Sequence, residues 1–300
     1  METIFSPVEK SFLKKAGDYQ MSTRIPYILV ENFPKLGLLT ALRFLEWVLE
    51  NPEGVISLPT GKTPEFFIKN TEFLLENWNK KKGEEIRKAC GLESAKKPDL
   101  GGLKFVQIDE FYPISPDQHN SFYNYVDNYY IKGFGLDRKR SLLINSDEIP
   151  LSKGKHFSKV FPDSQVDLSL IYREPKTELE KCQQTSILKI NDWCYTYEEK
   201  IREMGGIGFF LGGIGPDGHI AFNVRGSEHH SSTRLTPTNF ETQAVAAGDL
   251  GGIEVSRSRL VITIGLETIT YNPEAVAIIF AAGEAKADIV KASLESNISS

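Results

Sequence analysis

The stretch from Gly206 to Asn223, GIGFFLGGIGPDGHIAFN, constrains the fold more than any other part of the chain. It begins with an apolar run typical of a buried parallel strand, and the glycines that follow let the backbone turn sharply or approach a ligand closely. In open α/β sheets, ligands bind at the carboxyl ends of the strands. Asp217 and His219 are therefore expected at a ligand-binding crevice, although an ordinary tight turn explains the same residues equally well.

The length of 300 residues permits one large domain or two ordinary ones. Strand-like apolar runs alternate with helix-length amphipathic segments from start to end. This alternation predicts a single α/β domain over residues 1–300, with a doubly wound, mostly parallel sheet and helices on both faces.

Charge and cysteine usage limit the partners and the compartment. The net charge is −5, and the 35 Lys and Arg residues are scattered, so no nucleic-acid groove is expected, whereas an anionic small substrate is compatible. Cys90, Cys182 and Cys194 form no CxxC or CxxH pair, which favours thiols in a reducing compartment. The N-terminus has no secretion-signal pattern, and the longest apolar run is only Ala275 to Ala282, so a cytoplasmic protein without membrane contact is expected.

The first half of the chain contains a candidate anion site. Residues 1–24 are interpreted as a helix or arm, 27–30 as a strand and 34–49 as a helix. A strand over 55–58 then runs into PTGKTP, where a helix opens at Pro64. Such a loop offers free N–H groups and a positive helix end to a phosphate, and Lys62 adds a charge. An ordinary βα loop with a Thr N-cap is the alternative.

A second chemical signal follows the strand predicted at Leu103 to Ile108. Asp109 and Glu110 come directly after it, and neighbouring residues of a strand point to opposite faces, so only one carboxylate can face a given pocket. Asp109 is interpreted as a base in a partly desolvated site, with a solvated strand end as the alternative.

The remaining elements follow the same alternation. The aromatic-rich segment 119–131 is predicted to be a helix whose rings pack in the core, and 150–190 to be an insertion with some structure of its own. The other predicted elements are a strand at 142–144, a helix at 192–204 capped by Asn191 or Asp192, a polar loop at 225–233, strands at 260–264 and 275–280, and a helix at 283–294. Lys286 lies in the first turn of that last helix, where the dipole favours an anion, so it is a candidate phosphate contact.

Six motifs in order resemble the glucosamine-6-phosphate deaminase family: PTGKTP (59–64), IDEFYP (108–113), HNSFYNYV (119–126), GGIGPDGHIAFN (212–223), VITIGLETI (261–269) and AAGEAKA (281–287). The related 6-phosphogluconolactonases share the GxDGH turn, but the IDEFY motif and the DGHIAFN continuation are closer to the deaminases. A lactonase-type hydrolase is therefore the second interpretation.

The resemblance implies aldose–ketose isomerisation and deamination of glucosamine 6-phosphate to fructose 6-phosphate and ammonia, without metal or organic cofactor. In those roles His219 would open the sugar ring with Asp217 holding its imidazole, and Asp109 would move a proton from C2 to C1. The phosphate would be bound by Thr60, Gly61, Lys62, Thr63 and Lys286. Homo-oligomer formation is also implied.

This chain departs from the family at several positions. Val224 replaces a Glu of the ring-opening group, which favours slower ring opening or help from another carboxylate such as Glu228. Lys62 replaces the second Gly of the phosphate loop, and Gly248 stands near an expected active-site Arg. A non-catalytic sugar-phosphate-binding protein is therefore a further alternative.

Two other differences concern regulation and length. Ser227 and Arg234 match residues that bind the family's allosteric activator, whereas Thr236 replaces the expected Lys. The chain ends at Ser300, before the family's last strand, so its C-terminus is interpreted as truncated.

Overall fold

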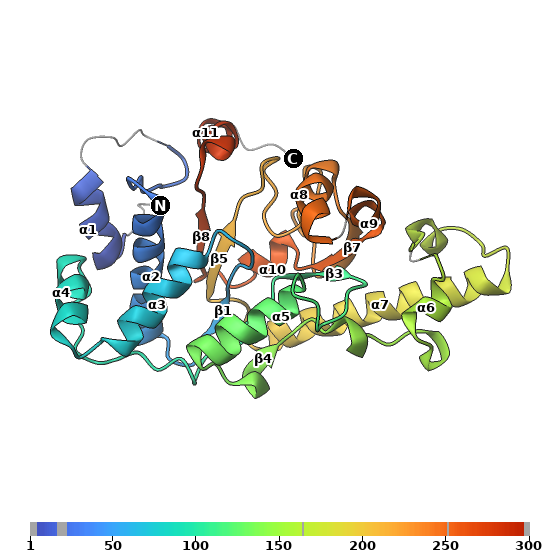
Figure 1. Ribbon diagram of the computed structural model, residues 1–300, viewed down its shortest axis with the longest axis horizontal. Coiled ribbons are helices and arrows are strands. Elements are labelled where there is room, and N and C mark those ends of the chain that lie inside the picture. Colours follow the sequence, from blue (N-terminus) through green and yellow to red (C-terminus); the bar gives the residue numbers. More distant parts are fainter. Residues whose placement is uncertain (1–4, 17–22, 164, 251, 297–300) are drawn as a thin grey trace.

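The computed structural model describes residues 5–16, 23–163, 165–250 and 252–296 (Figure 1). Within these ranges a parallel sheet has the strand order β4–β2–β1–β5–β8. Its strands are β1 (Val55–Ser57), β2 (Lys104–Val106), β4 (Ser141–Leu142), β5 (Phe209–Gly213) and β8 (Val276–Phe280). The order runs outward from β1 in one direction and then from β5 in the other, as in a doubly wound sheet. The predicted α/β fold class is confirmed.

Both faces of this sheet are buried, as is usual for a parallel sheet. Successive side chains of a strand point to opposite faces, so neighbouring residues of one strand enter different cores. Phe209 and Leu211 of β5 lie in the core on one face, and Phe210 between them lies in the core on the other. All three side chains are fully buried. A continuous apolar run is therefore what this position in the sheet requires.

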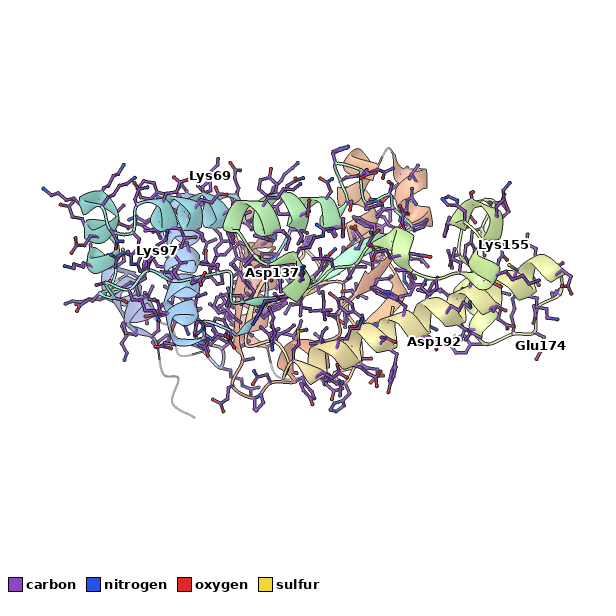
Figure 2. The ribbon with its side chains drawn as sticks, turned by 90° about the horizontal axis from the view of Figure 1, so that it is seen from below. Lys69, Lys97, Asp137, Lys155, Glu174 and Asp192 are labelled. Atoms are coloured by element: carbon purple, nitrogen blue, oxygen red, sulfur yellow. The ribbon has the colours of Figure 1, made fainter. Side chains whose placement is uncertain are left out.

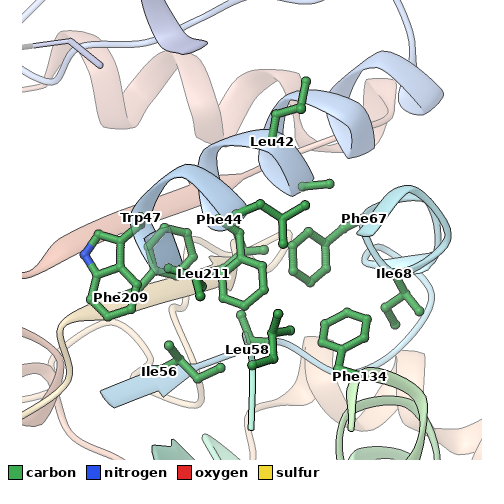
Figure 3. Packing of buried hydrophobic residues seen from close by; sticks show 14 of the residues in the cluster. Leu42, Phe44, Trp47, Ile56, Leu58, Phe67, Ile68, Phe134, Phe209 and Leu211 are labelled. Carbon is green, nitrogen blue, oxygen red and sulfur yellow. The ribbon is translucent and has the colours of Figure 1, made fainter. Parts of the chain in front are cut away.

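The first face is covered by α1 (Pro7–Ala16), α2 (Phe33–Glu50) and α3 (Glu65–Glu76), with α4 (Lys81–Ala89) beyond them (Figure 1). Figure 3 shows the aromatic packing beneath α2. The ring of Phe44 lies 5.4 Å from that of Phe209 and 5.7 Å from that of Phe67, measured between centroids. Asn32 caps α2 by accepting a hydrogen bond from the Lys35 N–H at 3.0 Å.

The second face is covered by α7 (Glu178–Glu203), α10 (Leu266–Thr270) and a second sheet. This sheet is antiparallel, in the order β3–β7–β6, and consists of β3 (Asp109–Tyr112), β7 (Leu260–Thr263) and β6 (Arg234–Pro237). The apolar run of β7 was predicted as a strand without its direction, residues 109–112 were predicted as a strand end, and β6 was not predicted. The strand predicted at 103–108 ends at Val106 instead.

The segment expected as an insertion lies along α7, which extends away from the sheets (Figures 1 and 2). It contains the short helices η4 (Ser152–Gly154), α6 (Phe157–Val160) and η5 (Leu168–Ile171), and η3 (Ser146–Glu148) lies just before it. The helix predicted to begin at Asn191 or Asp192 in fact begins at Glu178, with Thr177 as its cap. That part of the prediction is wrong, because the polar turns from 178 to 191 carry a weak apolar pattern.

The remaining elements are α5 (Phe122–Val126), the π-helix η1 (Asp127–Lys132), η2 (Arg138–Arg140), α8 (Phe240–Leu250), α9 (Ile253–Ser258), η6 (Glu284–Lys286) and α11 (Ala287–Glu295). The strand predicted at 27–30 is irregular chain, and α8 and α9 were not predicted. None of the helices in the described ranges combines the length and apolar character that a membrane span needs.

Candidate active site

A cavity of about 1150 Å³ opens at the carboxyl ends of β1 and β5, where the strand order reverses. Seven of the eight predicted site residues line it: Thr60, Gly61, Lys62, Thr63, Asp109, His219 and Lys286. Asp217, the eighth, contacts the His219 ring. The sheet topology therefore brings together segments that are more than 200 residues apart in sequence.

The loop after β1 presents unpaired backbone donors to this cavity. Among the described residues, the N–H groups of residues 60–63 have no hydrogen-bond acceptor. Gly61 has a φ of 91°, which a residue with a side chain adopts only with strain. The fully buried Tyr130 hydroxyl donates to the Pro59 carbonyl and anchors the start of the loop. Free N–H groups just before helix α3 form an arrangement suited to an anion.

Two lysines bring positive charge to the same cavity. Lys62 is an exposed residue of the loop, and Lys286 comes from η6, directly before α11. Partial burial lowers the pKa of Lys286 below its ordinary value. A bound anion would act in the opposite direction and favour the charged form of the lysine. A third cavity lysine, Lys69, is already paired with Glu65 at 2.5 Å.

The turn after β5 holds an imidazole and a carboxylate in contact. The Nδ1 atom of His219 lies 2.5 Å from Asp217 Oδ1, and each side chain is about 15% exposed. Gly215 is required beside them, because a Cβ atom there would lie 2.2 Å from the His219 ring. Since Nδ1 is engaged by Asp217, Nε2 is the nitrogen available for proton exchange in the cavity.

The same turn is fixed to strand β7. The N–H of Phe222 donates to the Thr263 hydroxyl at 3.1 Å, and the amide of Asn223 donates to the Ile264 carbonyl at 2.9 Å. The ring of Phe222 stacks on that of His219, with an interplanar angle of 13°. These contacts fix the orientation of the imidazole.

Asp109 reaches the cavity from β3, where it pairs across the sheet with Thr263 of β7. The residue is only 8% exposed, and no hydrogen bond to its carboxylate is formed within the described ranges. Burial, and to a smaller extent the adjacent Glu110 carboxylate, raises its pKa well above the ordinary value. An unpartnered carboxylate with a raised pKa is a stronger base than an exposed aspartate.

Glu110 is buried on the other side of β3, away from the cavity. It accepts hydrogen bonds from the N–H groups of Phe111, Phe122 and Tyr123 and from the Ser121 hydroxyl, at 2.7–3.0 Å. Burial raises its pKa to about 7 despite these donors. Glu110 therefore holds the start of α5, whereas Asp109 faces the cavity, in line with the strand alternation.

Some cavity residues were missed by sequence analysis. The loop before α5 contributes His119, Asn120 and Ser121, although the whole segment was expected to be core helix. Thr242 of α8 also lines the cavity, and its buried hydroxyl has no partner in the described part of the chain. Only the HNSFYNYV motif pointed to the first group, and no signal pointed to Thr242.

The departures from the family pattern have definite positions. Val224 is half-buried and Glu228 is exposed, and neither lines the cavity. The suggestion that Glu228 replaces the missing carboxylate is therefore not supported. Gly248 does line the cavity, and Arg234 donates to the Ser227 hydroxyl at 3.3 Å.

The described ranges contain no group of three or more His, Cys, Asp or Glu residues arranged to hold a metal ion.

Several proteins similar in sequence to this chain are named glucosamine-6-phosphate deaminases. No protein-family model matches the chain. A glucosamine-6-phosphate deaminase from Caenorhabditis elegans is 28% identical over 277 residues, which cover 91% of this chain and 81% of the relative.

Solved structures of two kinds share the fold. A monomeric glucosamine-6-phosphate deaminase superimposes with a TM-score of 0.65 at 21% identity, covering 90% of this chain and 87% of the other. A 6-phosphogluconolactonase from Leishmania guyanensis gives a TM-score of 0.55 at 14% identity, covering 90% and 86%. At 21% and 14% identity, these two similarities establish the fold of the chain and nothing further.

Proposed function

We propose that this relative of the glucosamine-6-phosphate deaminases converts glucosamine 6-phosphate and water to fructose 6-phosphate and ammonia. The observation that carries this proposal is the shared cavity: an unpartnered buried carboxylate, a His–Asp pair and a loop of unpaired N–H groups all border it. Two cations and a base at one site match a phosphorylated sugar that must lose a proton from carbon.

The phosphate is held by the loop of residues 60–63 together with Lys62 and Lys286. The unpaired N–H groups supply directed hydrogen bonds, and the two ammonium groups supply charge. The hydroxyl of Thr242 offers a further hydrogen bond to a sugar oxygen, because it otherwise stays unpaired in the described structure.

Ring opening uses His219. Its Nε2 takes the proton of the anomeric hydroxyl and returns a proton to the ring oxygen, so the C1–ring oxygen bond breaks and an aldehyde forms. Asp217 stabilises the imidazolium that exists between the two transfers.

Isomerisation and deamination use Asp109. Its carboxylate takes the proton at C2, and the electron pair of that C–H bond forms a double bond between C1 and C2. The π bond of the C1 aldehyde breaks at the same time, and its oxygen takes a proton from water to give an enol. Delivery of the proton to C1 leaves an iminium at C2, to which water adds before ammonia leaves. The raised pKa of Asp109 suits a group that must remove a proton from carbon.

Several finer properties belong to the same proposal. We place the enzyme in the cytoplasm as a sugar-phosphate-binding hydrolase that forms one α/β domain and uses no metal or organic cofactor. The predicted homo-oligomer stays a prediction, and the solved deaminase of similar fold is described as monomeric.

The test is a coupled assay of the purified chain with glucosamine 6-phosphate, in which ammonia and fructose 6-phosphate are measured separately. We expect equal amounts of the two products. A parallel assay follows hydrolysis of 6-phosphogluconolactone. Lactone hydrolysis alone would favour the hydrolase alternative. Tight binding of the sugar phosphate without product in either assay would instead indicate a non-catalytic binding protein, the reading that Val224 supports.

A further inference from the structure

We propose that Asn239 is a positioning residue that holds Asp217, and through it His219, in the orientation needed for ring opening. The amide nitrogen of Asn239 donates to Asp217 Oδ2 at 2.5 Å, while Asp217 Oδ1 contacts His219 Nδ1 at the same distance. The three side chains thus form a continuous hydrogen-bonded series. Asp217 is held at both oxygens.

The orientation of the Asn239 amide is determined by its second partner. Its side-chain oxygen accepts the N–H of Thr242 at 3.0 Å, in the first turn of α8. A backbone N–H can only donate and an ionised carboxylate can only accept, so the oxygen must face Thr242 and the NH₂ group must face Asp217. A flipped amide would place donor against donor at one end and acceptor against acceptor at the other.

This inference rests on the proposed function, because it assigns a role within the ring-opening step. Val224 supplies no carboxylate near His219, so the chain needs another way to orient the His–Asp pair. The amide of Asn239 adds no charge and takes no proton. It restricts rotation of Asp217, which keeps the proton of a neutral His219 on Nδ1 and leaves Nε2 free to accept one.

Asn239 also links the pair to another wall of the cavity. The helix that it caps, α8, lines the cavity through Thr242 and Gly248. A substrate that contacts α8 therefore contacts the same element that positions Asp217.

Two variants separate the cap from the contact with Asp217. Asn239→Ser keeps an N-cap oxygen for the Thr242 N–H, but its short side chain does not reach Asp217. Asn239→Ala loses both contacts. Asn32→Ala is the matched control, because it removes a comparable Asn cap from α2, which accepts the Lys35 N–H far from the cavity.

The readouts are kcat, KM, the thermal unfolding midpoint and the tautomer of His219. The tautomer is read by ¹⁵N NMR at a pH where the ring is neutral, with the His219 signals identified by their loss in His219→Gln. For Asn239→Ser we expect kcat to fall by about tenfold, with unchanged KM and midpoint, and part of His219 to move to the Nε2–H form. Asn32→Ala should lower only the midpoint.

Wild-type kcat together with a wild-type tautomer in Asn239→Ser would overturn the inference. If the wild-type protein shows no deaminase activity, the proposed function fails, but the tautomer comparison still decides whether Asn239 positions the pair. An unchanged tautomer then rejects the inference, and a shifted one supports it.

Discussion

The two loops that border the cavity from the parallel sheet are built in opposite ways. The loop after β1 has four backbone N–H groups without acceptors in the described structure, and its Lys62 side chain is exposed. The turn after β5 is fixed by hydrogen bonds from Phe222 and Asn223 to the β7 segment and from Asn239 to Asp217.

The difference corresponds to two functions, phosphate binding in the loop after β1 and proton transfer in the turn after β5. A phosphate binds wherever donors and charge are available, so that loop leaves its donors free for the ligand. Proton transfer requires a defined direction and tautomer of the histidine, so the hydrogen bonds of this turn hold His219 and Asp217 in one orientation. Changes in the first loop should therefore affect binding, and changes in the second should affect turnover.

Of the changes in these two loops, those in the turn after β5 are expected to have the largest effect. In Gly215→Ala the new Cβ would lie 2.2 Å from the His219 ring and displace it, so kcat should fall by about a hundredfold. Gly101→Ala is the control, because it adds the same methyl group at a residue that does not line the cavity, with the nearest atom 3.4 Å away. Steady-state kinetics of the pair check this, and equal kcat values for the two variants would contradict it.

A smaller effect, on binding, is expected for the lysines. Lys62→Ala and Lys286→Ala should each weaken binding of glucosamine 6-phosphate by about tenfold while kcat changes little, because each removes one charged phosphate contact. Lys69→Ala is the control, since Lys69 lines the cavity but is paired with Glu65. Calorimetry that finds equal affinity of the wild type for phosphorylated and unphosphorylated sugar would remove the phosphate site.

The smallest effect on turnover is expected for Glu110, which acts on stability. Glu110→Gln cannot accept from all four donors, so the free energy of unfolding should fall by about 1–3 kcal/mol. The folded-state pKa of about 7 lies above the ordinary value of 4.5, so the folded state binds the proton more tightly than the unfolded state. Wild-type stability should then decrease as the pH rises from 4.5 to 7, and less so in the variant.

Chemical denaturation at several pH values measures both quantities for Glu110. A variant as stable as the wild type, with the same pH dependence, would show that the four hydrogen bonds do not hold the start of α5.

The sequence predicted the site better than the elements around it. Thr60 to Thr63 and Asp109 closely follow short apolar runs, and His219 follows one after a glycine-rich turn, so the signal for each is local in the sequence. The pairing of β3 with β7 was not predictable, because a short apolar run such as Leu260–Thr263 is the same whether its neighbour is parallel or antiparallel.

Other residues could not be found from sequence for a related reason. Asn239 caps a helix that was not predicted and Thr242 lies in its first turn, and their importance depends on contacts with Asp217 and with the cavity. The Glu228 hypothesis failed because closeness in sequence to Val224 did not place its side chain at the cavity. Whether such a side chain reaches the cavity depends on contacts between segments that are distant in the sequence.

The most direct test of the central claim is the turnover of Asp109→Asn relative to the wild type, measured as ammonia and fructose 6-phosphate from glucosamine 6-phosphate. An amide cannot take the C2 proton, so we predict a loss of at least about a hundredfold in kcat. The variant should bind the sugar phosphate as the wild type does and be at least as stable at neutral pH, because the buried carboxylate has no partner in the described structure. An Asp109→Asn protein that turns over at the wild-type rate would contradict the account.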